Sequence, residues 1–164
     1  MPRFTRTTRT ATLARGVFTI RKGIGFLHAG QFDLALREFR RVAGSVNPKT
    51  TRTVKSVAAF YAYNTERFRK EGKKVTFGNA NLMDFAAGNS GDAWSDVDIA
   101  AVLVAGSDRA TTQLLAAFLG RSVEAVRFQR RYAFSAPLGS WTTERGSKYT
   151  RFTQNQRVVR ELGL

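Results

Sequence analysis

One short stretch of the chain combines side chains whose hydrogen-bonding groups match the edges of nucleobases. Arg127, Gln129, Arg130 and Arg131 all fall within one predicted helix over residues 123–132. Arginine pairs with O6 and N7 of guanine and glutamine with N6 and N7 of adenine, so these residue types suit a major groove. The alternative interpretation is a solvated basic helix in a small bundle.

The elements that must position this helix begin with a capping box. Ser95 followed by Asp98 predicts a helix that starts at Asp96. Its two aspartates lie in the first turn, where the helix dipole favours negative charge. This first helix is predicted to end near Ala105 and Gly106.

Two further helices follow in the sequence. Thr111 or Thr112 is predicted to cap the second, and Gly120 to end it. Ser122 is predicted to cap the third, which runs from Val123 to about Tyr132. Three short helices, with the last two joined by a three-residue turn that contains glycine, form the helix-turn-helix plan.

A family resemblance rests on the same segment, residues 94–134. Trp94-Ser95, the run LLAAFL at 114–119 and Gly-Arg-Ser-x-x-Ala-Val at 120–126 are similar to the Myb/SANT-like helix-turn-helix of bacterial and phage proteins. The resemblance implies that the third helix enters the major groove with Arg127, Phe128 and Arg131. It also implies a core that includes the side chains of Trp94, Leu119 and Val126. One position departs from the family pattern, because Arg130 stands where a large aromatic residue is common.

Charge is strongly segregated along the chain. The formal net charge is +15 and the pI is about 11.3, which favours a polyanionic partner. Residues 1–74 and 109–164 carry the basic excess, whereas 75–108 contain five aspartates and no basic residue. A membrane surface is the less favoured partner, because binding to it would require a basic amphipathic helix with exposed Trp or Leu. No apolar run in the sequence approaches the length of a membrane span.

The composition argues against an enzyme. There is no cysteine and the only histidine is His28, which removes thiolate nucleophiles and histidine-rich metal sites. No P-loop or Gly-x-Gly-x-x-Gly motif is present. Capping explains the Asp96 and Asp98 pair better than catalysis does. We therefore expect no catalytic residues, no metal and no cofactor.

The rest of the chain is predicted to be helical as well. Two helices are expected between Ala11 and Ala43, a third from about Lys49 to Glu71 with Pro48 at its start, and a small one at 80–87. The fold class is therefore mainly α. The expected organisation is a flexible basic arm (1–10), a helical bundle domain (11–88), a linker (89–93), the helix-turn-helix domain (94–134) and a basic extension (135–164).

The C-terminal extension interleaves aromatic and basic residues. Trp141 and Tyr149 lie among Arg145, Lys148 and Arg151, and a short helix is predicted within the final segment QRVVRELGL. Aromatic side chains among basic ones are able to stack on single-stranded bases. Packing of the extension onto its own domain is the favoured interpretation.

These patterns together predict a protein that binds double-stranded DNA as a sequence-specific transcriptional regulator. It is expected in the cytoplasm of a bacterial cell, associated with the nucleoid. The alternatives are a nonspecific architectural protein, an RNA-binding protein, and a protein-docking module that uses the acidic 92–108 segment or the N-terminal bundle. The candidate DNA-contacting residues are Arg3, Arg6, Arg9, Arg109, Arg121, Ser122, Glu124, Arg127, Phe128, Gln129, Arg130, Arg131, Arg145, Lys148 and Arg151.

Overall fold

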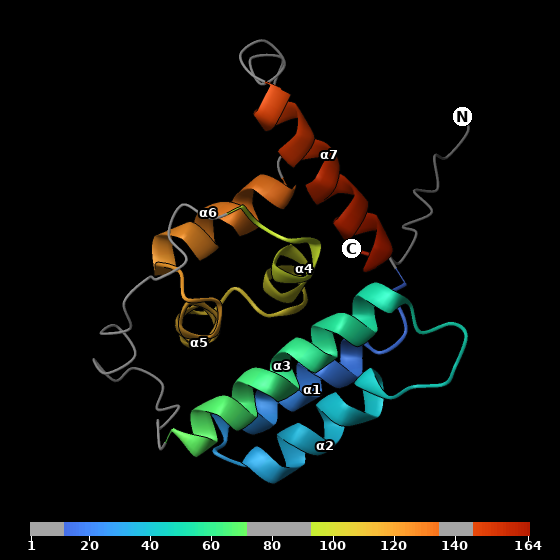
Figure 1. The fold of residues 1–164 in the computed structure, drawn as a ribbon, viewed down its shortest axis with the longest axis vertical. Helices are drawn as coiled ribbons and strands as arrows, with labels where there is room; N and C mark the ends of the chain where they lie inside the picture. The colour runs from blue at the N-terminus through green and yellow to red at the C-terminus, as the bar shows by residue number, and fades with distance from the viewer. Residues whose placement is uncertain (1–11, 72–92, 135–145) are drawn as a thin grey trace, which may run out of the picture.

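The computed structural model describes residues 12–71, 93–134 and 146–164, and in this part of the chain every regular element is a helix. The predicted mainly α fold class is therefore confirmed. The helices are α1 (Val17–His28), α2 (Phe32–Ala43), α3 (Arg52–Lys70), α4 (Asp96–Val104), α5 (Arg109–Leu119), α6 (Val123–Phe134) and α7 (Gly146–Glu161), shown in Figure 1.

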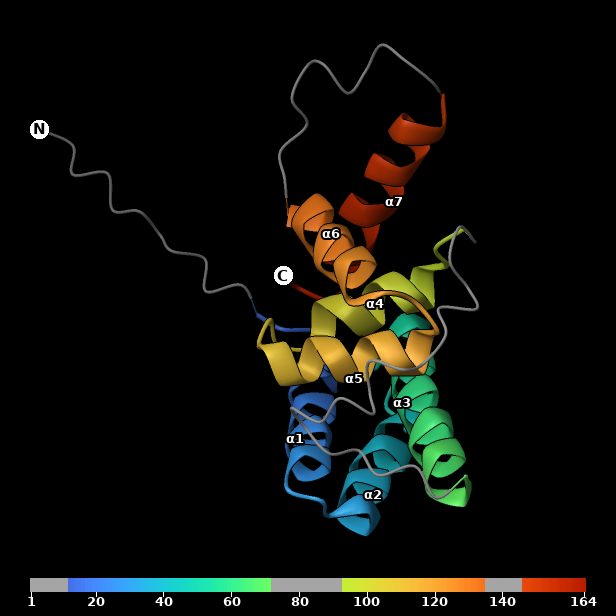
Figure 2. The same cartoon turned by 90° about the vertical axis from the view of Figure 1, so that its left-hand side faces the viewer.

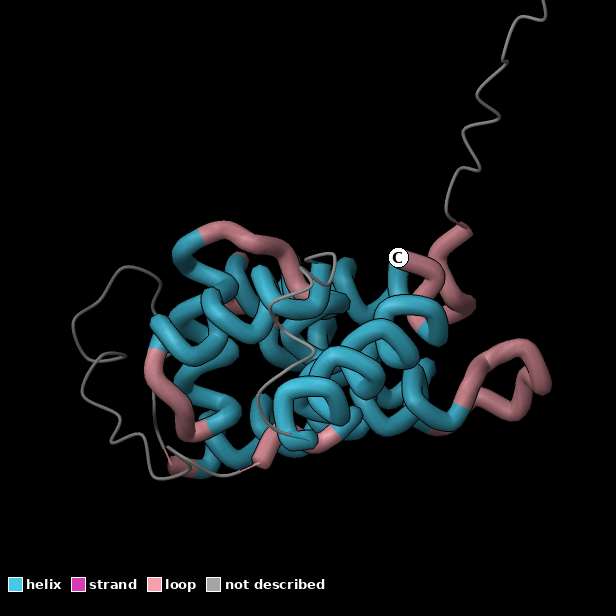
Figure 3. The backbone as a smooth tube through the Cα atoms, turned by 90° about the horizontal axis from the view of Figure 1, so that it is seen from above, coloured by secondary structure: helices cyan, strands magenta, loops and turns pink. Residues whose placement is uncertain are grey.

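The helices form three levels. Helices α1, α2 and α3 make a lower group, α4 and α5 lie across it, and α6 and α7 lie on the far side of α4 (Figures 1 and 2). Residues 29–31 join α1 to α2 and residues 44–51 join α2 to α3; loops are drawn in pink in Figure 3. α6 and the lower group are therefore on opposite sides of the molecule.

The first two helices form as their apolar spacing predicts. Val17, Ile20, Ile24 and Leu27 are all buried along one stripe of α1. Gly23 lies in the same helix against the ring of Phe39 from α2, where a Cβ atom would approach a ring carbon to 2.6 Å. The α1–α2 packing distance therefore depends on a glycine at this position.

Helix α3 begins later than the sequence predicted. Pro48 does not start it, because the N-cap is Thr51, whose side chain accepts a hydrogen bond from the backbone N–H of Val54 at 3.3 Å. Pro48 instead lies in a turn, in which the side-chain and backbone oxygens of Asn47 accept from the N–H groups of Lys49 and Thr50. The apolar side chains of α3 that face the core include Val54 and Phe68, both of which are buried.

One hydrophobic core runs through both expected helical units. Tyr61 of α3 is fully buried and its hydroxyl donates to the carbonyl oxygen of Ala101 in α4 at 2.6 Å. Phe118 of α5 meets the edge of Phe68 at a ring separation of 4.9 Å. The buried side chains of α1–α3 and of α4–α7 belong to a single cluster.

Helix α7 is longer than predicted. It begins at Gly146, whereas the sequence indicated only a short helix within the last nine residues. Val158 of α7 and Leu162, just after its end, are fully buried. The predicted arm at 1–10, the helix at 80–87 and the linker glycines at 88 and 91 lie outside the described residues.

Candidate nucleic-acid interface

The helix that precedes the candidate interface starts where the capping box placed it. The Ser95 hydroxyl accepts a hydrogen bond from the backbone N–H of Asp98 at 3.1 Å, and α4 begins at Asp96. α5 differs from the prediction, because Asp108 caps it and not Thr111 or Thr112. The Asp108 carboxylate accepts from both the N–H and the hydroxyl of Thr111, which satisfies more donors than a threonine cap would.

The turn between α5 and α6 has the predicted geometry. Gly120 ends α5 in the left-handed conformation, at φ 64°. The Ser122 hydroxyl accepts from the N–H of Ala125 at 3.1 Å and so caps α6. α6 then continues to Phe134, two residues beyond the predicted end at Tyr132.

Four side chains form the exposed face of α6. Glu124, Arg127, Phe128 and Arg131 follow the spacing i, i+3, i+4 and i+7, and all four are exposed. Arg127 pairs with Glu124 at 3.2 Å. The ring of Phe128, 53% exposed, meets Tyr132 edge-on at 4.4 Å. This face presents donors, an acceptor and an apolar group on one rigid helix.

Gln129 does not lie on that face, so its predicted exposure is wrong. It is 4% exposed, and its amide nitrogen donates to the side-chain oxygen of Asn155 in α7 at 2.8 Å. Asn155 is itself fully buried. The sequence prediction did not foresee that α7 packs against this side of α6.

Arg130 is also turned away from the exposed face. Its guanidinium donates to the carbonyl oxygen of Gly106 at 2.9 Å, to that of Val102 and to the Thr112 hydroxyl. Burial lowers the pKa of Arg130, and nearby Tyr61 and Asp108 partly offset this effect. The arginine thus closes the C-terminal end of α4, where a cation is favoured by the helix dipole.

Arg121 stabilises the start of the unit. It is 7% exposed, its guanidinium lies 4.1 Å from the centre of the Trp94 ring, and it donates to the Ala93 carbonyl. Leu119 and Val126 are buried and Trp94 packs against the core, as the family resemblance implied for all three.

Comparison with models of known families, with curated proteins and with solved structures finds no match to this chain. The case for a nucleic-acid interface therefore depends on the geometry of α6 alone.

The remaining predicted site residues are scattered. Ser122 and Arg109 are exposed, at the starts of α6 and α5. Arg3, Arg6, Arg9 and Arg145 lie outside the described residues, and Lys148 and Arg151 lie on α7 before the first residue whose side chain is described there. The exposed face of α6 is thus the part of the predicted site that the structure brings together.

The sequence analysis missed a polar contact between α1 and α5. The Nε2 atom of His28 lies 2.7 Å from the hydroxyl oxygen of Thr111, and the Thr111 hydroxyl donates to the Asp108 carboxylate. Burial lowers the pKa of His28, although the charge of Asp108 opposes the shift. Burial alone would raise the pKa of Asp108, but the bonds from Thr111 and the nearby His28 lower it. The single histidine was a signal, but its partner lies 83 positions away.

Arg21 makes a second polar contact from α1, in this case to the end of α4. Its Nε donates to the carbonyl oxygen of Val104 at 2.8 Å. Arg21, His28 and Asp108 line one open hollow of about 510 Å³. Because the hollow mixes both signs of charge and its polar groups bond one another, we interpret it as a joint between helices.

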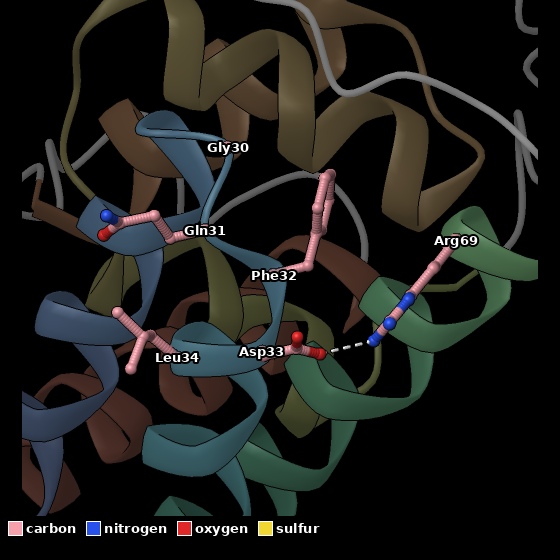
Figure 4. Close-up of a pocket in the computed structure, with 6 residues that line it drawn as sticks. All are labelled: Gly30, Gln31, Phe32, Asp33, Leu34 and Arg69. Carbon is pink, nitrogen blue, oxygen red and sulfur yellow. Dashed lines mark hydrogen bonds and ion pairs between the residues drawn. The ribbon is translucent and has the colours of Figure 1, made fainter.

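A hollow beside the α1–α2 turn is also self-paired. Asp33 and Arg69 line it and form an ion pair at 2.7 Å, shown by the dashed line in Figure 4. Phe32 projects beside them in the same view. The carboxylate already holds the cation, so this hollow does not suit a polyanion.

Within the described residues, no group of three or more histidine, cysteine, aspartate or glutamate side chains is placed to hold a metal ion. None of the helices in the described part of the chain combines the length and apolar character needed to cross a membrane.

Proposed function

We propose that this chain binds double-stranded DNA in the major groove through the exposed face of α6, as a sequence-specific transcriptional regulator. The observation that carries the proposal is the arrangement of Glu124, Arg127, Phe128 and Arg131 on one exposed face of a helix that follows a capped three-residue turn. An α-helix fits the major groove, and only one face of it reaches the bases.

The chemistry of that face suits base edges. Arg127 and Arg131 supply forked donors for guanine, and the Phe128 ring supplies an apolar contact for the methyl group of thymine. Glu124 pairs with the Arg127 guanidinium at 3.2 Å, and both side chains are exposed. An exposed ion pair is weak, so Arg127 can exchange this contact for a guanine.

The number of phosphate contacts from this unit is small. In the described segment 93–134 the exposed arginines are Arg109, Arg127 and Arg131, because Arg121 and Arg130 bond to backbone carbonyls within the fold. Affinity through α6 alone should therefore depend only moderately on salt.

Selection of bound sequences from a randomised duplex pool at about 150 mM salt tests the proposal. The full chain should enrich one motif, and Arg127→Ala/Arg131→Ala should lose it, at about 1–3 kcal/mol for each lost base contact. Arg37→Ala/Lys70→Ala is the matched control, because it removes two exposed cations from α2 and α3. Binding without enrichment, equal in all three proteins, would overturn base reading by α6.

Protein docking by the same face is the second candidate. The exposed Phe128 and its edge contact with Tyr132 favour it, since an exposed aromatic anchor is typical of protein interfaces. Phe128→Ala distinguishes the two functions. It should alter preference at one base position if α6 reads DNA, and should leave the selected motif unchanged if the ring contacts a protein.

A further inference from the structure

An open hollow at the start of α1 has no carboxylate in its lining, unlike three others on the described surface. The other three contain Asp33, Asp108 or the pair Glu66 and Glu71. The exception, of about 320 Å³, lies between the start of α1, the end of α2 and the connection to α3. Two arginines from different elements line it, Arg15 and Arg41. We call it the Arg15–Arg41 hollow.

The two arginines of this hollow are available for a ligand. Arg15 is exposed and has no ion pair or hydrogen bond within the described residues. Arg41 forms an ion pair with Glu38 at 3.7 Å, which is longer than a hydrogen bond. Both guanidinium groups therefore keep donors for an incoming anion.

A hydroxyl pair adds a donor at the same place. Thr50, 6% exposed, and the half-buried Ser45 both line the hollow, and their hydroxyl oxygens lie 3.1 Å apart. The Ser45 oxygen also accepts from the N–H of Asn47. The two hydroxyl groups share one bond, so one O–H hydrogen of the pair has no acceptor within the described residues. That hydrogen is able to be donated to an anion in the hollow.

The backbone of α1 contributes in the same direction. Its N-cap is Gly16, at φ 94°, which supplies no side-chain cap. Val17 N–H bonds to Ala14 and Ile20 N–H to Gly16, whereas the N–H groups of Phe18 and Thr19 have no acceptor within the described residues. Thr19 lines the hollow. First-turn amides of this kind favour an anion such as phosphate.

From this combination we infer that the Arg15–Arg41 hollow binds a phosphate of a nucleic-acid backbone, as a second contact surface distinct from α6. Nucleic acid is favoured over a free anion because the described residues 12–71 hold twelve basic side chains against four acidic ones. An exposed aromatic ring, Phe18, lies one residue before Thr19 and is 71% exposed.

The position of the hollow gives this second surface a consequence. The residues that line it come from the start of α1, the end of α2 and the α2–α3 connection, and none comes from α6. In Figure 1 the α2–α3 connection lies on the right and α6 on the left. The two surfaces are therefore separate. If the proposed function of α6 holds, the chain has two contacts with nucleic acid and is able to bridge two duplex segments.

The first arm of the test isolates the hollow from α6. ¹⁵N-labelled Arg127→Ala/Arg131→Ala protein is titrated with a 12-base-pair duplex, and the amide signals of Phe18 and Thr19 should shift and saturate. Introducing Arg15→Ala and Arg41→Ala into the same variant should weaken its binding to the duplex at least tenfold. It should also lower the slope of log K against log salt by about 2. Unchanged shifts would overturn the inference, whatever α6 does.

Inorganic phosphate distinguishes the source of the anion. Binding of phosphate alone at the same two amides, with no gain in affinity for the duplex, would show a free-anion site and contradict a nucleic-acid surface. Tighter binding of the duplex than of phosphate supports it.

The second arm measures bridging with the full chain. A biotinylated duplex on beads should capture a second, fluorescent duplex through the protein. Arg15→Ala/Arg41→Ala should reduce that capture at least tenfold while still binding the first duplex, and Arg37→Ala/Lys70→Ala should leave it unchanged. Loss of capture that is equal in both double variants would show only a general charge effect and would overturn the hollow as the second surface.

Discussion

The α1–α3 region and the α4–α6 region differ in how many of their basic side chains lie on the surface. In α1–α3 most basic side chains lie on the surface, and Arg15 and Arg41 face an open hollow. Two of the five arginines in the segment 93–134 make contacts within the fold. Arg121 lies over the Trp94 ring, and Arg130 donates to carbonyl oxygens at the end of α4. The comparison teaches that the number of basic residues in a segment does not give the number that a polyanion can reach.

Breaking the shared core should give the largest effect. Phe118 is 4% exposed and meets the rings of Phe60, Tyr61 and Phe68. Phe118→Ala should lower the free energy of unfolding by about 3–5 kcal/mol. Because the core is continuous, urea unfolding followed by NMR should show both regions losing structure in one transition.

The control for this variant is an exposed ring. Phe128→Ala should change stability by less than about 1 kcal/mol, since Phe128 is 53% exposed. A Phe118→Ala protein in which α1–α3 stays folded after α4–α6 has melted would contradict a common core.

A smaller effect should separate the two uses of arginine within one helical unit. Arg121→Ala removes the contact with Trp94 and the bond to Ala93, so it should cost about 2–3 kcal/mol of unfolding free energy. Arg127→Ala removes an equal charge from the surface and should cost no more than about 0.5 kcal/mol. Chemical denaturation followed by tryptophan fluorescence measures both, and equal losses would refute the structural role of Arg121.

The joint between the two regions should respond to pH. Because the pKa of His28 is lowered in the folded protein, the unfolded chain binds more protons just below the ordinary value of 6.5. Stability from this group is therefore complete above pH 6.5 and falls as the pH drops toward 5. Urea unfolding at several pH values should show this decline, and His28→Gln should reduce it.

Asp108 contributes in a separate pH range. Its lowered pKa adds stability that is present above its ordinary pKa of 3.8 and is lost only as the pH falls through the folded value. Stability that rises as the pH drops from 7 to 5 would contradict the described contacts of His28.

Local chemistry made several boundaries predictable from the sequence. Ser95, Gly120 and Ser122 act on backbone groups within a few residues of themselves, so their roles follow from spacing alone. The prediction of the N-cap of α5 was wrong, because Asp108 and Thr111 are both residue types that cap helices. The choice between them depends on Asp108 accepting two bonds from Thr111.

Long-range contacts explain what the sequence did not predict in the site. Gln129 and Arg130 have residue types that suit a DNA-facing surface, but their partners are Asn155 in α7 and carbonyl oxygens near the end of α4. Helical spacing places side chains around an axis and does not say which neighbouring helix covers each side. Arg127, Phe128 and Arg131 are exposed, as a DNA-facing surface requires, because no described helix covers their side of α6.

The buried amide pair of Gln129 and Asn155 has a consequence for the rotation of α6. If α7 slid along α6 by one residue, the two amides would separate and each would lie buried without its partner, at about 1–3 kcal/mol apiece. Purely apolar contacts between α6 and α7 would tolerate such a slip. The amide pair makes the docking of α7 a discrete register, and α6 consequently presents one fixed angular sector to solvent.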